Sequence, residues 1–191
     1  VKPQFLEEVL DEIKDNVKEG QIFISIAPGK TLQWLGEHLG EGTKIIRTMP
    51  NTPAMVGEGM TALCVNEQVT EQETLLAVTL CNTFGKTEVI PERLMDVVVG
   101  VSGSSPAYVF MFLEAMADAA VADGMPRAQA YKFAAQAVLG SAKLMLETGK
   151  HPGELKDMVC SPAGTTIQAV RVLEEKGLRS AVIEAQMECV K

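Results

Sequence analysis

Hydrophobic residues follow two alternating patterns over the first 90 positions. Over residues 3–19 they recur every three or four positions, which predicts a helix that ends at Gly20. After it, short β-branched runs alternate with further helical stretches, and this alternation is typical of an α/β layer with a largely parallel sheet. The predicted strands cover residues 21–26, 43–48, 59–65 and 86–90, and the predicted helices between them cover residues 31–39 and 70–84.

From residue 91 onward the pattern is almost entirely helical. Residues 107–122 and 134–142 are rich in small side chains, which let neighbouring helices approach closely. Because these helices are apolar around much of their circumference, we expect another subunit to cover them, with a monomeric helical core as the alternative. The chain therefore divides into an incomplete α/β part, residues 1–90, and an all-α part, residues 91–191. The predicted helices of the second part cover residues 91–100, 106–123, 127–148, 152–159, 165–176 and 178–190.

Composition and charge narrow the possible partners. The 191 residues carry a formal charge of −8 and no cluster of lysine and arginine, which argues against a nucleic-acid partner. The chain has no apolar run long enough to span a bilayer and no leader that resembles a signal peptide, so we expect no membrane association and a cytoplasmic location. Two histidines and four separated cysteines give no metal-binding spacing, and we expect the thiols to be reduced and mostly buried.

The first three residues are typical of a strand end that runs into a helix. Pro3 suits the first position of that helix, because its missing N–H would have no partner there. A natural start does not fit this place, and we expect further sequence before Val1.

A loop of small residues at positions 161–166 opens into the helical stretch that follows it. Backbone N–H groups at a helix start have no intrahelical partner, and the helix dipole adds positive potential there. Gly164 would let the backbone approach a ligand closely, and Ser161, Thr165 and Thr166 add hydroxyl groups. The loop can therefore hold a carboxylate without a cationic side chain, although an ordinary helix cap and turn is the alternative.

Two other loops have less specific patterns. Residues 27–31 (APGKT) end like a phosphate-binding P-loop, but Ile24 stands where that motif needs its first glycine, so a tight strand-to-helix turn is the better interpretation. Such a turn can still lie against a dinucleotide, because strand ends line the ligand crevice of such sheets. Residues 47–53 (RTMPNTP) form a loop whose two prolines would present Asn51 rigidly, either for function or as a purely structural turn.

Three motifs together resemble those of the pyrroline-5-carboxylate reductases, the family that catalyses the last step of proline biosynthesis. The resemblance runs over the whole chain, in order and without large gaps. It implies the C-terminal portion of a Rossmann-like dinucleotide-binding domain over residues 1–90. A helical substrate-binding and dimerisation domain would follow, which interlocks into a homodimer and can assemble further into rings. The motifs are residues 47–53 (RTMPNTP), 102–108 (SGSSPAY) and 161–167 (SPAGTTI), supported by 123–127 (DGMPR) and 151–156 (HPGELK).

The resemblance also implies a chemistry and a set of site residues. Such reductases transfer hydride from NADPH or NADH to the C=N bond of 1-pyrroline-5-carboxylate and release L-proline. The substrate carboxylate would lie on the loop, and Thr166 would hydrogen-bond the substrate as the catalytic residue. The substrate-binding residues so implied are Ser161, Ala163, Gly164, Thr165 and Thr166, and the cofactor-binding residues are Val1, Lys2, Pro3, Ile26, Ala27, Pro28 and Asn51, with no metal ligand.

This sequence departs from the family pattern at several places. The glycine-rich phosphate fingerprint would precede Val1, so we expect the chain alone to bind dinucleotide poorly and to be inactive. Ser105 and Ala163 stand where glycine is usual, and Ala163 would be strained if its φ were positive. A non-catalytic dimerisation fragment of such an enzyme is the alternative function. A related imine or hydroxyacid reductase is disfavoured, because those enzymes usually carry a lysine in the first long helix after the sheet, and residues 105–124 contain none.

Overall fold

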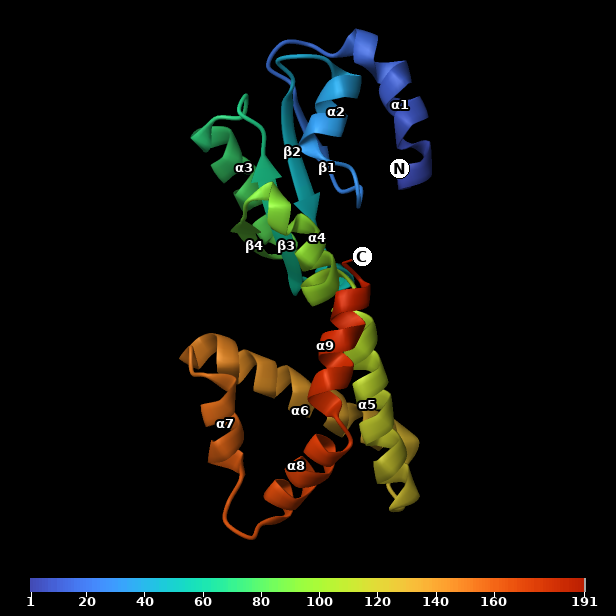
Figure 1. Cartoon of the computed structure of the whole chain (residues 1–191), viewed down its shortest axis with the longest axis vertical. Coiled ribbons are helices and arrows are strands. Elements are labelled where there is room, and N and C mark those ends of the chain that lie inside the picture. Colours follow the sequence, from blue (N-terminus) through green and yellow to red (C-terminus); the bar gives the residue numbers. More distant parts are fainter. Residues whose placement is uncertain (191) are drawn as a thin grey trace. The chain divides into compact units, whose positions relative to one another are not determined.

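The computed structural model describes residues 1–190, which fall into two compact units (Figure 1). The first unit comprises Val1–Pro106 together with the end of the chain from Glu188, and the second comprises residues 107–187. The functional boundary between residues 90 and 91 stays a prediction, because the limits of compact units need not coincide with those of functional domains.

The first unit is built on a four-stranded sheet in the order β1-β2-β3-β4 (Figure 1). β1 pairs with β2 and β3 pairs with β4 in parallel, whereas β2 and β3 pair antiparallel. The sequence predicted a largely parallel sheet and did not predict the antiparallel pairing of β2 with β3. These two strands pair antiparallel because the link between them is short. It contains the 3₁₀ turn η3 (Thr52–Val56) and no crossover helix, which a parallel pair would need. The strands are β1 (Ile22–Ser25), β2 (Lys44–Met49), β3 (Gly59–Val65) and β4 (Gly85–Val89).

Helices cover both faces of the central strand β2. Ile45 and Ile46 are adjacent in β2 and therefore point to opposite faces of the sheet. Ile45 packs with Leu10 of α1 and Leu35 of α2, whereas Ile46 packs with Ala77 of α3. The helix predicted over residues 3–19 is α-helical only in its middle, and 3₁₀ turns form its two ends. The helical elements here are η1 (Pro3–Phe5), α1 (Leu6–Ile13), η2 (Lys14–Asn16), α2 (Leu32–Leu39), α3 (Glu71–Cys81) and η4 (Asn82–Phe84).

The face of the sheet that carries α2 also receives the segment after β4. Met95 in this segment is 1% exposed and packs against Cys64, which is the register partner of Arg47. Arg47 lies two residues after Ile45 and so points to the same face of the sheet. The Arg47 side chain therefore lies on the face of the sheet that α2 covers, and it pairs with Glu92 and Asp96 of the segment that follows the sheet.

The rest of the chain is helical, with bounds close to those predicted from its glycine and proline residues. A π-helical turn, η6, joins α4 to α5, so that Glu92–Ala122 is one stretch that is long and apolar enough to cross a membrane by length and composition. The expectation of no such run is wrong, because the sequence predicted two separate helices, over residues 91–100 and 106–123, where the structure has one helical stretch. The elements are η5 (Glu92–Leu94), α4 (Met95–Val98), η6 (Val99–Gly103), α5 (Ser105–Ala122), α6 (Arg127–Thr148), α7 (Pro152–Val159), α8 (Thr165–Glu175) and α9 (Leu178–Glu188).

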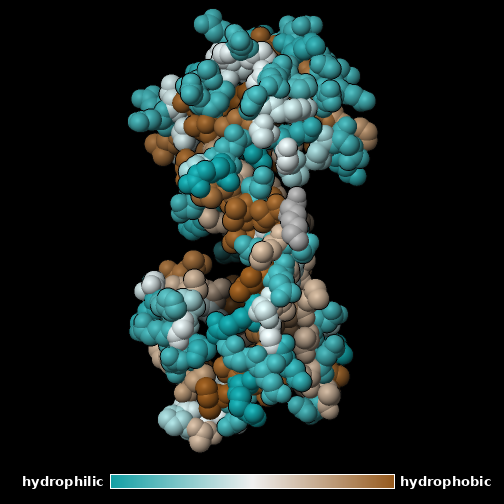
Figure 2. Space-filling view, viewed as in Figure 1, coloured by the Kyte–Doolittle hydropathy of each residue, from teal (hydrophilic) through white to brown (hydrophobic). Residues whose placement is uncertain are grey.

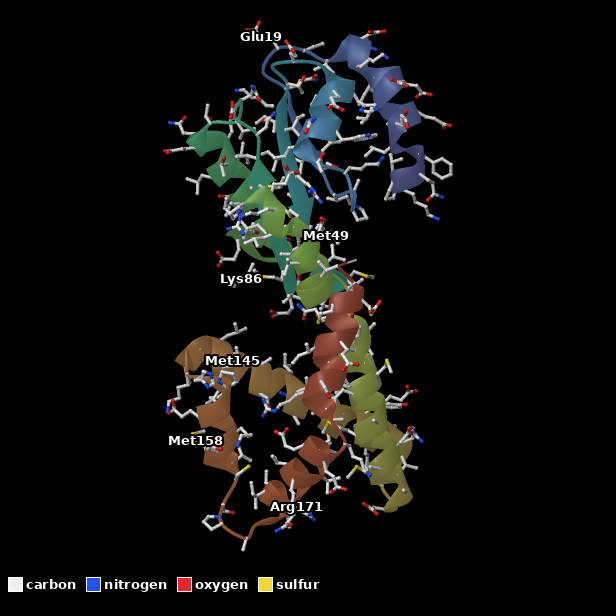
Figure 3. All side chains as sticks on the ribbon, viewed as in Figure 1. Glu19, Met49, Lys86, Met145, Met158 and Arg171 are labelled. Atoms are coloured by element: carbon white, nitrogen blue, oxygen red, sulfur yellow. The ribbon has the colours of Figure 1, made fainter. Side chains whose placement is uncertain are left out.

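The second unit has almost no large buried side chain. Among its described residues, 107–187, the buried ones are three alanines, Ala117, Ala130 and Ala134. Large apolar side chains lie on its surface instead, including Met145 of α6 and Met158 of α7 (Figure 3), and hydrophobic patches interrupt its hydrophilic surface (Figure 2). A unit of this size cannot be stabilised by alanines alone, so its exposed apolar faces need a partner surface.

Candidate functional site

The loop before α8 is a tight turn with a strained residue. The Gly164 N–H donates to the Ser161 carbonyl oxygen at 3.0 Å, which closes a β-turn with Pro162 at its second position. Ala163, at the third position, has a φ of +60°, and it is the one non-glycine residue with positive φ among residues 1–190. Turns with proline second and a positive φ third favour glycine at that third position. The strain anticipated at Ala163 is therefore present, at a cost of about 1–2 kcal/mol.

Gly164 sits where a side chain would not fit. A Cβ at this residue would lie 2.5 Å from the Ser161 Oγ and 3.1 Å from the Ser161 carbonyl oxygen. Gly164 is also the residue immediately before α8, and it has no side chain with which to bond the first amides of that helix. The close packing of Ser161 over Gly164 therefore explains why this helix start keeps an uncapped backbone.

The first turn of α8 presents free donors to solvent. The structure confirms that this helix begins at Thr165, so the N–H groups of Thr165, Thr166 and Ile167 have no acceptor within the helix. Thr165 is exposed and Thr166 is half-buried. The positive end of the helix dipole adds to these donors, so the loop and the first turn together can hold a carboxylate.

The predicted cofactor residues lie in the first unit, and several of them share one end of the sheet. Ile26, Ala27 and Pro28 follow β1, and Asn51 follows β2. Because β1 and β2 run in parallel, these two loops leave the sheet at the same edge, where ligands bind in open α/β sheets. Ile26 is 61% exposed, whereas Ala27 is buried. The loop after β1 therefore offers an apolar side chain and backbone groups rather than charge.

The first residues of the chain reach the same loop. Val1, Ile26 and Ala27 line one pocket of about 210 Å³, together with residues of α1 and α2. Pro3 begins η1, at the helical position that the sequence predicted. The pocket is smaller than the roughly 300–1,000 Å³ of ordinary ligand sites, so it can hold only part of a dinucleotide.

The Asn51 side chain is already engaged within the protein. Its Nδ2 donates to the Ser102 carbonyl oxygen at 3.0 Å, and its Oδ1 accepts from the Met60 N–H at 2.9 Å. Asn51 thus ties the loop after β2 to β3 and to the π-helical turn η6. An asparagine side chain has two donors and two acceptor positions, so one N–H and one lone pair remain for a ligand. A structural role for Asn51 is observed, and its cofactor contact stays a prediction.

Glu92 is a site residue that sequence reasoning missed. Its Oε1 accepts the Leu32 N–H at 2.7 Å and Arg47 Nη1 at 3.0 Å. The Thr31 hydroxyl oxygen accepts the Trp34 N–H at 3.0 Å, so the start of α2 is capped twice. A phosphate at this helix start would meet the Glu92 carboxylate, which excludes the P-loop interpretation of residues 27–31. Glu92 lies 60 residues from Leu32 in sequence, and no spacing rule would have found it.

Cys64, the cysteine near the hydrogen bonds of Glu92, does not offer a reactive thiolate. Cys64 and Cys81 are buried, and Cys160 and Cys189 are half-buried. Burial, with a smaller contribution from Glu92, raises the pKa of the Cys64 thiol to about 11. The Cys64 thiol therefore stays protonated at neutral pH and acts as a small apolar side chain.

Comparison with known proteins gives the family. Residues 92–191 match the sequence model described as pyrroline-5-carboxylate reductase dimerisation. The pyrroline-5-carboxylate reductase of Escherichia coli strain K12 is 61% identical over 191 residues, which is 100% of this chain and 71% of that protein. The chain belongs to the pyrroline-5-carboxylate reductase family. The reductase of Methanosarcina acetivorans is 48% identical over 185 residues, or 97% of this chain and 68% of that protein.

Solved structures of reductases have the same fold as this chain. The pyrroline-5-carboxylate reductase of Coxiella burnetii matches it with a TM-score of 0.93 at 37% identity, over 100% of this chain and 71% of the other. The Plasmodium falciparum reductase, solved with NADP bound, matches with a TM-score of 0.92 at 32% identity, over 100% and 76%. The predicted Rossmann-like portion followed by a helical dimerisation domain is confirmed.

The individual site residues stay predictions at this point. The structure brings Ser161 to Thr166 together at the start of α8, in the second unit, and it brings Val1, Ile26 and Ala27 together in the first. Among residues 1–190, no group of three or more His, Cys, Asp or Glu side chains is placed to hold a metal ion.

Proposed function

We propose that this chain, within its full natural polypeptide, takes part in the chemistry of its family, the transfer of hydride from NADPH or NADH to the C=N bond of 1-pyrroline-5-carboxylate, which yields L-proline. The observation that carries the proposal is the uncapped start of α8 behind the turn at Ala163 and Gly164. It lies in a chain that is 61% identical to the Escherichia coli reductase. A non-catalytic dimerisation module is the second candidate, because the family model that matches is described as dimerisation.

The substrate carboxylate would bind at the start of α8. Its oxygens would accept from the N–H groups of Thr165 and Thr166, in the loop that also contains Ser161, Ala163 and Gly164. These amides need no cation and little reorganisation when they bind, because the helix fixes their direction in advance. The strained turn at Ala163 keeps the Ser161 side chain folded over Gly164, so that the anion approaches bare backbone.

Thr166 would orient the ring nitrogen. The protonated imine is the electrophilic form of the substrate, and its N–H can donate to the Thr166 hydroxyl oxygen while the backbone N–H groups of Thr165 and Thr166 hold the carboxylate. Hydride addition to the ring carbon converts the C=N bond to C–N and neutralises the positive charge of the iminium. The resulting secondary amine then takes up a proton from solvent to give the ammonium form of L-proline. The two contacts fix the ring against the hydride donor, which is the main task that remains for the protein.

The residues of the first unit fit the uncharged end of the dinucleotide. The exposed Ile26 side chain and the small, buried Ala27 suit a nicotinamide ring, whereas the carboxylate of Glu92 does not suit a phosphate. Val1, Lys2, Pro3 and Pro28, with the remaining donor of Asn51, would complete this side, as the sequence resemblance implies. When bound, NADPH or NADH supplies the hydride and is oxidised. The Plasmodium falciparum reductase, which was solved with NADP bound, supports the choice of cofactor.

The second unit would form the homodimer. Its buried residues are alanines, and Phe133 and Leu146 of α6 are 68% and 81% exposed, so a second copy is needed to cover its helices. The family model over residues 92–191 supports the same conclusion. The finer proposal, that dimers assemble into a ring, is tested by the solution mass at several protein concentrations. A cytoplasmic location also stays a prediction.

The test is the rate of NADPH oxidation with 1-pyrroline-5-carboxylate, measured on the full natural polypeptide. Thr166→Ala should lower kcat/KM by the equivalent of about 1–3 kcal/mol, the scale of a lost hydrogen bond to a charged group. Thr79→Ala, which removes an exposed hydroxyl on α3, should leave the rate unchanged. A dimer with no substrate-dependent oxidation would favour the dimerisation module, and an unchanged rate in Thr166→Ala would remove Thr166 from the mechanism.

A further inference from the structure

The loop between β1 and α2 is held at both ends by hydrogen bonds, one with a residue of β2 and one with a residue that pairs with β2. At its first end the Thr48 hydroxyl donates to the Ser25 carbonyl oxygen at 3.1 Å. At its second end the Leu32 N–H donates to Glu92 Oε1 at 2.7 Å, and the same oxygen accepts from Arg47 at 3.0 Å. Residues 26–31 lie between these two points. Neighbouring residues of one buried strand therefore help to fix both ends of the predicted nicotinamide loop, Thr48 directly and Arg47 through Glu92.

The second attachment is an ion pair that is largely shielded from water. The Arg47 side chain is 7% exposed and the Glu92 side chain is 32% exposed. Asp96, the other partner of Arg47, is 71% exposed and lies at 3.4 Å. Because exposed ion pairs contribute little, whereas removing one partner of a shielded pair leaves a buried charge uncompensated, Glu92 is the partner that matters most to the guanidinium. Without Glu92, the Leu32 N–H would lose its acceptor, and the guanidinium would keep only the exposed Asp96 carboxylate.

Glu92 differs from an ordinary helix cap in where it comes from. The start of α2 already has its own cap, the Thr31 hydroxyl on the Trp34 N–H. Glu92 belongs instead to η5, in the segment after the sheet, and it is the first residue of the match to the dimerisation model. The contact therefore links the segment that enters the helical part of the chain to the loop after β1.

We propose that Glu92 is a positioning residue for the cofactor. With Arg47 it fixes the start of α2, and thereby the backbone of residues 26–28 against which the nicotinamide end would lie. The inference rests on the proposed function, since it assigns that loop to the dinucleotide. It predicts that removal of the Glu92 carboxylate weakens cofactor binding by loosening the loop, while the substrate loop before α8 keeps its own structure.

Three variants of the full natural polypeptide separate positioning from general stability. Glu92→Ala removes both hydrogen bonds, Glu92→Gln keeps an acceptor for the Leu32 N–H but removes the charge, and Asp96→Asn alters the exposed partner of the same arginine. NADPH alone is titrated, and the fluorescence of Trp34 is followed; Trp34 is the one tryptophan in the sequence and lies in the first turn of α2. The steady-state KM for NADPH and kcat are measured in parallel.

We expect Glu92→Ala to raise the NADPH dissociation constant about five- to thirtyfold, the factor that corresponds to one or two lost hydrogen bonds. The kcat at saturating NADPH should change less than about twofold, Glu92→Gln should lie between Ala and wild type, and Asp96→Asn should match wild type. If Glu92→Ala does not fold, Glu92→Gln against Asp96→Asn carries the comparison.

Two results would overturn the proposal. One is a folded Glu92 variant that binds NADPH as tightly as wild type, and the other is an equal loss of affinity in Asp96→Asn. Failure of the proposed function looks different, because the wild-type polypeptide would then show neither NADPH binding nor substrate-dependent oxidation.

Discussion

The strained turn before α8 makes opposite predictions for the same substitution at two nearby alanines. Ala163 has a φ of +60°, where an L-residue costs about 1–2 kcal/mol relative to the right-handed region. Glycine removes that cost but loses about 0.5–1 kcal/mol through the greater freedom of the unfolded chain. Ala163→Gly should therefore raise the free energy of unfolding by about 0.5–1 kcal/mol.

Ala169 is the matched control. It is exposed and lies in the interior of α8, where the backbone is helical and glycine is unfavourable. Ala169→Gly should lower the free energy of unfolding by about 1 kcal/mol. The two variants change the same atoms six positions apart, so the sign of the effect reports the backbone conformation rather than the loss of a methyl group.

The assay is urea denaturation followed by far-ultraviolet circular dichroism. Protein concentration is held constant, because the stability of a dimer depends on it. The midpoint should rise for Ala163→Gly and fall for Ala169→Gly, with unchanged slopes. A fall of about 0.5 kcal/mol or more in Ala163→Gly would mean that Ala163 is not in the left-handed region, and would refute the strained turn.

Three further outcomes follow from the structure. Gly85→Ala should destabilise the protein by about 3 kcal/mol in urea denaturation, because a Cβ there would lie 1.9 Å from the Gly59 carbonyl oxygen, which is backbone and cannot move aside; an effect below about 1 kcal/mol would contradict the close approach of β3 and β4. The hydrogen bond from Lys44, with that from the Thr70 N–H, lowers the pKa of Glu73 from 4.5 to about 2. A depressed carboxylate pKa gives stability that is complete above pH 4.5 and is lost as the pH falls toward 2, so acid titrations of wild type and Lys44→Met should differ at pH 5 and converge near pH 2. The Cys64 thiol, with its pKa near 11, should resist alkylation at pH 7 in the folded protein and react once urea unfolds it.

Local signals in the sequence predicted most helix and strand positions. The capping box at Thr70 and Glu73 is present, with the Glu73 N–H donating to the Thr70 hydroxyl oxygen and the Glu73 carboxylate accepting from the Thr70 N–H. Gly149 ends α6 in the left-handed conformation that a helix end requires. These features depend on residues close in sequence, so a pattern along the chain is enough to find them.

Features that join distant residues could not be predicted in the same way. The antiparallel pairing of β2 and β3 follows from the compact link between them, which the sequence marked only as a loop with two prolines. The hydrogen bond of Glu92 to Leu32 depends on the sheet face that Arg47 occupies, which is known only once the strands are paired. At Ala163, the sequence predicted strain if φ were positive, but only the structure of the turn shows that φ is positive.

The start of α8 as a carboxylate site is the central claim, and one titration tests it most directly. Amide chemical shifts of the full natural polypeptide are measured by NMR as L-proline is added, and again as pyrrolidine is added, which has the same ring and nitrogen but no carboxylate. The account predicts that the amides of Gly164, Thr165 and Thr166 shift and saturate with L-proline and do not shift with pyrrolidine. Saturable binding of L-proline that leaves those three amides unmoved would contradict it.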